Sequence, residues 1–150
     1  MSQKAKESAE LVSEMTGLPN RRAFDERSTS PFVAISDVDN LTPINDRFGH
    51  SVGDMLLRRF AEVLTSVGLD PYHHLGGTFL CKGESYQELN LKLSQARQIL
   101  RQQPFSVSDV DGRITAIESA EFSFGIGTTV EEAEVSLGQQ KKLRVSESGK

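Results

Sequence analysis

Residues 37–54 read DVDNLTPINDRFGHSVGD, and this stretch decides the fold. It follows a short apolar run at residues 32–35, FVAI, which is rich in residues that favour β-strands. It leads into a segment over about residues 52–67 in which apolar side chains recur at helical spacing. The stretch therefore links a buried strand that ends near Asp37 to a long amphipathic helix, with one or two helical turns within residues 39–50.

Periodicity and turn residues predict the other elements. Gly76-Gly77 is typical of a hairpin turn, and Asp111-Gly112 is a second two-residue turn. The predicted elements are a weak helix over 4–14, a short helix over 21–27, strands over 72–75 and 78–81, a helix over 85–101, strands over 105–110, 113–117 and 122–127, and a helix over 130–143. This order predicts an α/β sandwich in which helices flank a mixed central β-sheet.

The composition is that of one water-soluble globular domain: the chain has 150 residues, of which 37% are hydrophobic and 25% charged. We expect this domain to span residues 15–145, after an N-terminal helix or connector at 1–14 and before a frayed tail at 146–150. A net charge of −4 argues against nucleic acid as a partner. No apolar run is long enough for membrane insertion. A single cysteine, Cys81, allows no internal disulfide and favours a cytoplasmic location.

Four segments, in the right order, resemble the GGDEF family of diguanylate cyclases. Residues 15–24, MTGLPNRRAF, are similar to the family's L-T-G-L-x-N-R-R-x-F, and residues 37–54 to its D-x-D-x-F-K-x-x-N-D-x-x-G-H-x-x-G-D. Residues 75–77 begin the motif that names the family, and residues 122–127, FSFGIG, are similar to its T-x-S-x-G-x strand. The resemblance implies a fold related to nucleotide cyclases and polymerase palm domains. It also implies an ancestral reaction that condenses two GTP molecules to cyclic di-GMP with divalent metal.

This resemblance implies roles for individual residues, each with a simpler alternative. Asp37 matches the family's metal-binding aspartate, with the Val38 carbonyl as a second ligand; the alternative is a turn residue at a strand end. Asn45 and Asp54 match the two residues that read guanine, and the alternative for Asp54 is an acid near a helix N-terminus, where the helix dipole favours it. Lys141 matches a phosphate-binding lysine, though it is weakly placed and an ordinary surface lysine is the alternative.

The chain departs from the family within the name motif. In place of G-G-D/E-E-F it has Gly76, Gly77, Thr78, Phe79 and Leu80. Both acidic positions are thus lost, and one carboxylate alone holds Mg²⁺ poorly because this ion prefers several well-placed anionic oxygens. We therefore expect the metal position at Asp37 and Val38 to be an empty remnant.

Further charges are missing around that position. Thr42 replaces a phosphate-facing lysine, and Val67 replaces the arginine of the family's R-x-x-D inhibitory product site, so that Asp70 alone remains of it. The strand after Gly77 also reads as shortened, with the next turn at Lys82-Gly83. Positions for metal, phosphate and feedback are damaged while the positions that read the base survive, and this pattern is typical of a pseudo-enzyme.

The sequence therefore favours a catalytically inactive GGDEF-like domain that acts as a regulatory or protein-interaction module, with at most weak guanine-nucleotide binding. Two alternatives stay open: an active diguanylate cyclase with a non-standard site, and a ligand-free scaffold or dimerisation domain. We expect no cofactor, with Mg²⁺ needed only if nucleotide binding or activity remains. The expected partner is another protein or a second copy of this chain.

Overall fold

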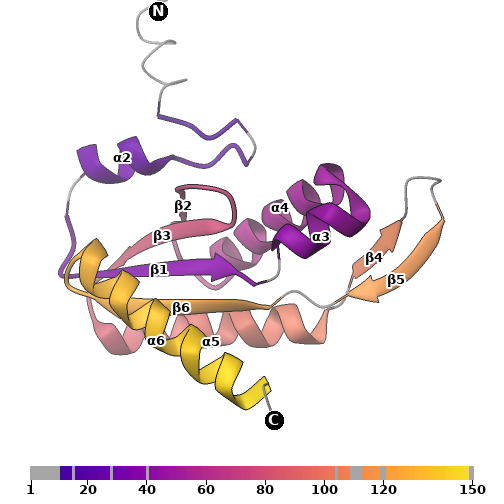
Figure 1. The fold of residues 1–150 in the computed structure, drawn as a ribbon. Coiled ribbons are helices and arrows are strands. Elements are labelled where there is room, and N and C mark those ends of the chain that lie inside the picture. Colours follow the sequence, from indigo (N-terminus) through magenta and orange to yellow (C-terminus); the bar gives the residue numbers. More distant parts are fainter. Residues whose placement is uncertain are drawn as a thin grey trace, which may run out of the picture.

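The computed structural model describes residues 11–14, 16–27, 29–39, 41–103, 105–108, 113–118 and 121–148 (Figure 1). Its elements in chain order are α2 (Arg21–Glu26), β1 (Phe32–Val38), α3 (Leu41–Phe48), α4 (His50–Ser66), β2 (Tyr72–His73), β3 (Thr78–Gly83), α5 (Tyr86–Gln102), β4 (Phe105–Ser108), β5 (Ile114–Glu118), β6 (Phe122–Gly127) and α6 (Val130–Ser148). No helix in these ranges is long and apolar enough to cross a membrane.

The central sheet has the strand order β2-β3-β1-β6, which confirms the predicted α/β sandwich. Each of its three described pairings is antiparallel, so the prediction of mixed pairing was wrong. The reason is the hairpin. The chain crosses from β1 through α3 and α4 to β2, which points the same way as β1, but β3 then turns back and inserts between these two strands.

Alternation along β1 supplies one buried side chain to each face of the sheet in turn. Ala34 and Val38 join the core beneath α4 and α5, whereas Val33 and Ile35 join the core beneath α2 and α6. Figure 1 shows α6 crossing one face of the sheet while α5 lies against the other. Phe60 of α4 belongs to the core beneath α4 and α5, and its ring centroid lies 5.2 Å from that of Phe79.

Helix α6 lies unusually close to β6 because two strand residues lack side chains. A Cβ added at Gly125 would lie 2.2 Å from the carbonyl oxygen of Ala133 and 2.2 Å from the amide nitrogen of Leu137. At Gly127 the nearest atom, Glu132 Cβ, would be 2.5 Å away. Helix α6 continues to Ser148, so residues 146–148 of the predicted frayed tail are helical; residues 149–150 lie outside the described part.

The predicted first helix is wrong over residues 11–14. Val12 instead forms an antiparallel bridge with Pro19, because Gly17 adopts a φ of 73° and turns the chain back on itself. Residues 4–10 of that prediction lie outside the described residues. His73 ties this turn to β2: its backbone N–H donates to the Pro19 carbonyl at 2.8 Å, and its ring is bonded to the Ser13 hydroxyl.

The strands of the first hairpin differ from their predictions in length. β2 stops at His73 rather than at residue 75, and β3 continues through Gly83, where the sequence predicted a turn at Lys82-Gly83. The latter two residues still pair with Val33 and Phe32 of β1, which explains the longer strand. β4 and β5 form a separate two-stranded sheet, and their predicted turn at residues 111–112 lies outside the described residues.

Candidate functional site

Asp37 lies near the carboxyl end of the central strand, where three strands meet. In the antiparallel register it faces Thr78, the first residue of β3, on one side and Ser123, near the start of β6, on the other. Because both neighbours run against β1, their first residues converge on its last ones. The sequence prediction that Asp37 ends a strand beside the name motif agrees with this arrangement.

Both carboxylate oxygens of Asp37 accept hydrogen bonds from side chains of this protein. The Thr78 hydroxyl donates to Oδ1 at 3.3 Å. The Lys141 ammonium, which comes from α6, donates to Oδ2 and forms an ion pair with it. The Asp37 side chain is 26% exposed and that of Lys141 40%, so the pair lies at the surface and contributes only about 0–1 kcal/mol to stability.

The hairpin that carries the name motif packs directly on the end of β1. Gly76 adopts a φ of 48°, and the Gly77 carbonyl accepts from the Val38 amide at 3.0 Å. A Cβ at Gly77 would lie 3.2 Å from Leu41 Cδ2 and 3.3 Å from Val38 Cβ, so a side chain here would crowd both residues. Glycine thus lets the hairpin approach closely enough for Thr78 to reach Asp37.

The next two motif residues belong to the hydrophobic cores. Phe79 and Leu80 are both 0% exposed. They enter opposite cores, because neighbouring strand residues point to opposite faces. The Phe79 ring packs against Phe60 and lies 5.0 Å from the His73 ring. An acidic side chain at this position would therefore be buried among aromatic rings without a counter-charge.

The residues around Asp37 do not fit a magnesium site. Mg²⁺ requires near-octahedral oxygen ligands, usually including one or two carboxylates and several waters. Here a neutral hydroxyl faces the Asp37 carboxylate, and an ammonium already contacts it. The Asp39 carboxylate, two residues further on, accepts from the Ser123 hydroxyl at 3.1 Å. Within the described residues no group of three His, Cys, Asp or Glu side chains could hold a metal ion.

Asn45 and Asp54, the predicted guanine-reading residues, lie on the neighbouring helices α3 and α4. The turn between these helices depends on Gly49, which has a φ of 91°. The Asn45 side chain reaches α4 at Gly53, where an added Cβ would lie 1.7 Å from Asn45 Oδ1. This oxygen is buried and has no hydrogen-bond partner among the residues that the structure describes. The structure thus brings the Asn45 amide next to the residue that precedes Asp54 and leaves an unsatisfied acceptor there.

The helix-dipole explanation for Asp54 is weakened by its position. Helix α4 begins at His50 and has no acidic residue in its first turn, which places Asp54 beyond that turn. The dipole acts mainly on charges within the first turn, so it does not account for an acid at this point. The Asp54 side chain is half-buried.

The pairing of Lys141 with Asp37 was missed by sequence reasoning, which assigned Lys141 to phosphate or to the open surface. The two residues are 104 positions apart in sequence. A signal was nevertheless present, because the small side chains of residues 123, 125 and 127 alternate with Phe122 and Phe124 along one strand. Such a face allows a helix to approach a sheet closely, and α6 does so.

Asp70, the remnant of the inhibitory site, belongs to a different surface. It is exposed and lines a polar cleft of about 300 Å³ that Asp37 and Lys141 do not line. Two lysines and two glutamates also line this cleft: Lys82, Lys92, Glu84 and Glu88. Lys92 is already held there by Glu88, at 2.8 Å. Nearby, burial raises the pKa of the Cys81 thiol to about 12, with the Asp70 charge as a lesser cause.

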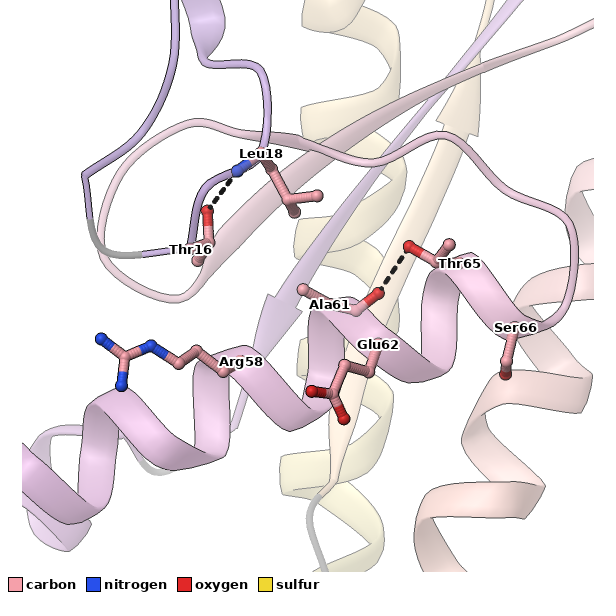
Figure 2. Close-up of a pocket in the computed structure, with 7 residues that line it drawn as sticks. All are labelled: Thr16, Leu18, Arg58, Ala61, Glu62, Thr65 and Ser66. Atoms are coloured by element: carbon pink, nitrogen blue, oxygen red, sulfur yellow. Dashed lines mark hydrogen bonds between the residues drawn. The ribbon is translucent and has the colours of Figure 1, made fainter. Parts of the chain in front are cut away.

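Another pocket, of about 390 Å³, lies between the N-terminal turn and α4 (Figure 2). No site residue predicted from the sequence lines it. Its hydroxyl groups are used locally: Thr65 donates to the Ala61 carbonyl at 2.9 Å, and Ser66 donates to the Val63 carbonyl at 2.7 Å. Thr16 accepts from the Leu18 amide at 3.2 Å. We therefore do not assign this pocket as the functional site.

A family model described as "Diguanylate cyclase, GGDEF domain" matches residues 11–75. The match ends directly before Gly76. Among curated proteins, the chain is 31% identical to the diguanylate cyclase DgcP of Escherichia coli K12 over 150 aligned residues, which cover 85% of this chain and 43% of the relative. The chain thus spans less than half the length of this relative.

Solved structures give the same relationship. The diguanylate cyclase SiaD of Pseudomonas aeruginosa, in complex with its activator SiaC, superposes with a TM-score of 0.73 and 25% identity over 94% of this chain and 62% of that one. The coiled coil and GGDEF domain of DgcB from Caulobacter crescentus, in complex with c-di-GMP, gives a TM-score of 0.69 at 21% identity over 99% of this chain and 86% of that one. The second likeness concerns the fold alone.

Proposed function

This chain belongs to the GGDEF domain family, and from this premise we propose that it is a catalytically inactive member that acts as a regulatory or protein-interaction module. The observation that carries the proposal is the environment of Asp37. A threonine faces this carboxylate, and a lysine of the same chain pairs with it. Cyclase chemistry needs divalent metal to neutralise the triphosphate and to activate the attacking hydroxyl, and these residues offer no such site.

Loss of the second motif acid supports the same proposal. Phe79 is fully buried at that position, so the acid has been exchanged for a core residue rather than moved to a neighbouring one. Thr42, where the family has a phosphate-facing lysine, is exposed and uncharged. An acid of the metal position and a phosphate-facing lysine are thus both replaced in the sequence, which supports the proposal.

Weak guanine-nucleotide binding is the second part of the proposal, and Asn45 supports it. Its buried Oδ1 lacks a partner, which costs free energy unless a donor satisfies it. The half-buried Asp54 carboxylate would accept from the base, and the Asn45 amide would complement it once turned away from its contact with Gly53. Without metal or the lysine at residue 42, such binding would depend on the base more than on the phosphates.

A protein partner, or a second copy of this chain, is the proposed object of regulation. The relative SiaD was solved with an activator protein, which gives a precedent within the same fold. A non-catalytic domain can retain such an interaction after its chemistry is lost, because a partner contacts the outer surface rather than Asp37. A purely structural scaffold remains the alternative if no nucleotide binds.

Incubation with GTP and either Mg²⁺ or Mn²⁺ tests the proposal. We expect no cyclic di-GMP by anion-exchange chromatography, with the diguanylate cyclase DgcP of E. coli as the positive control. Product that accumulates with time, and that disappears in Asp37→Ala, would overturn the proposal. Contaminating cyclase is excluded by the same variant, because a contaminant would not respond to Asp37→Ala.

A further inference from the structure

We propose that Lys141 is a built-in cation of this site, whose ammonium takes the place of a divalent metal at Asp37 and thereby excludes one. The proposal rests on the non-catalytic function above, since a working cyclase would need Asp37 for metal. It goes further by proposing that one residue of α6 supplies the positive charge that a divalent metal would provide at Asp37.

Geometry already places the ammonium where a cation would bind. Lys141 contacts Oδ2 of Asp37, and the Thr78 hydroxyl donates to Oδ1, so the carboxylate is satisfied on both sides. The contact does not depend on a chance surface rotamer alone. Helix α6 is seated against β6 through Gly125 and Gly127, and this close seating brings residue 141 over the end of β1.

In a competition for the Asp37 carboxylate, the Lys141 ammonium is favoured over a divalent ion from solution. A group fixed on a neighbouring element acts at an effective concentration of roughly millimolar or above, and it pays little further entropy to bind. A divalent ion from solution would have to displace the ammonium from the Asp37 carboxylate, which faces a neutral hydroxyl, while the Asp39 carboxylate is bonded to Ser123. Mg²⁺ loses its bound waters reluctantly, and binding to a carboxylate that an ammonium already contacts does not compensate for that loss.

Thr78→Glu provides the background for a test, because residue 78 faces Asp37 in register and a glutamate there would supply a second carboxylate. Two double variants are then compared: Thr78→Glu with Lys141→Met, and Thr78→Glu with Lys142→Met. They have the same net charge, and Lys142 is an exposed neighbour on the same helix. Mn²⁺ binding is measured by electron paramagnetic resonance of the free ion, without nucleotide.

We expect the Lys141→Met double variant to bind Mn²⁺ at least about tenfold more tightly than the Lys142→Met one, a difference of about 1.4 kcal/mol. Equal affinity of the two would overturn the inference, as would micromolar Mn²⁺ binding by the wild-type protein. Since no GTP is present, this failure is distinct from failure of the proposed function, which would appear as cyclic di-GMP.

A measurement without Thr78→Glu keeps the inference testable if that substitution impairs folding. Lys141→Met alone is expected to lower the thermal midpoint by up to about 4 °C, and to have no such effect when Asp37→Asn is already present. An equal shift in both backgrounds would show that Lys141 does not act through Asp37, and would overturn the inference.

Discussion

On the proposed function, single residues around the end of β1 separate this protein from an active cyclase, whereas its fold does not. Threonine at residue 78 still reaches Asp37, but as a neutral donor rather than a second carboxylate. Phe79 has joined the core next to Phe60, so restoring the acid there would bury a charge. On the proposed function, catalysis would require changes to the core and to Lys141 as well as to the motif.

Sequence reasoning identified most of these residues but not their partners. Asp37, Thr78 and the lost acids were recognisable because they lie within a contiguous motif. The Lys141 pairing joins residues 104 positions apart, and only the seating of α6 on β6 brings them together. Likewise, the helix-dipole alternative for Asp54 depended on where α4 begins, which periodicity alone does not fix to within a turn.

Cys81 provides a prediction at the residue scale. Its thiol is buried, and its pKa is raised from the ordinary 9.0 to about 12, so it stays protonated in the folded protein. The unfolded chain ionises this thiol at lower pH. The resulting contribution to stability is therefore fully present below pH 9 and is lost as the pH rises toward about 12.

We accordingly expect the folded protein to resist thiol reagents at pH 8, and to react fully only in denaturant. The free energy of unfolding should fall more steeply above pH 9 in the wild type than in Cys81→Ala. Rapid labelling of the native protein, at the rate of a free thiol, would show that Cys81 is accessible and contradict its assignment to the core.

At the scale of elements, the strand and helix order was predictable and the pairing was not. Helix α5 was predicted from its apolar spacing, and its buried residues are those the periodicity indicated: Leu89, Leu93, Ala96 and Leu100. Antiparallel pairing throughout the described sheet arises because β3 inserts between β1 and β2. The alternation of apolar and polar residues along a strand does not indicate between which neighbours that strand will lie. The N-terminal turn was missed because Gly17 reverses the chain where weak amphipathicity suggested a preceding helix.

The seating of α6 yields a prediction with a matched control. Gly125→Ala would place a Cβ 2.2 Å from backbone atoms of Ala133 and Leu137, which cannot move without shifting the whole helix. We expect a loss of about 1–3 kcal/mol in the free energy of unfolding by urea. Gly138→Ala, on α6 itself, meets nothing within 4 Å and should instead stabilise by about 0.5–1 kcal/mol.

The Gly125 variant also bears on the ion pair, because displacement of α6 would move Lys141 away from Asp37. A neutral effect of Gly125→Ala would mean that α6 is not held against β6 as closely as the Cβ distances require. The account of how Lys141 reaches the site would then lose its basis, whereas a destabilising Gly138→Ala would affect only the helix.

At the scale of the whole molecule, the chain has a GGDEF fold in which Thr78 and Phe79 stand where the name motif has acids. The core on each face of the sheet is filled, and the name-motif hairpin contributes to both. On the proposed function, such a domain would keep its shape, its surface and part of the family's nucleotide pocket after losing the metal position. Its fold was predictable from sequence because the family segments span most of the chain, whereas the state of the site depended on contacts between distant segments.

The most direct test of this account is an NMR titration with guanine and adenine nucleotides, each with and without Mg²⁺. We predict weak shifts around Asn45 and Asp54 that are similar for GMP, GDP and GTP, absent for the adenine series, and unchanged by Mg²⁺. Asp54→Ala should abolish them, while Asp46→Ala, which removes a neighbouring acid on α3, should not. GTP binding that strengthens about tenfold or more with Mg²⁺ would show that a metal acts at Asp37, and would contradict the account.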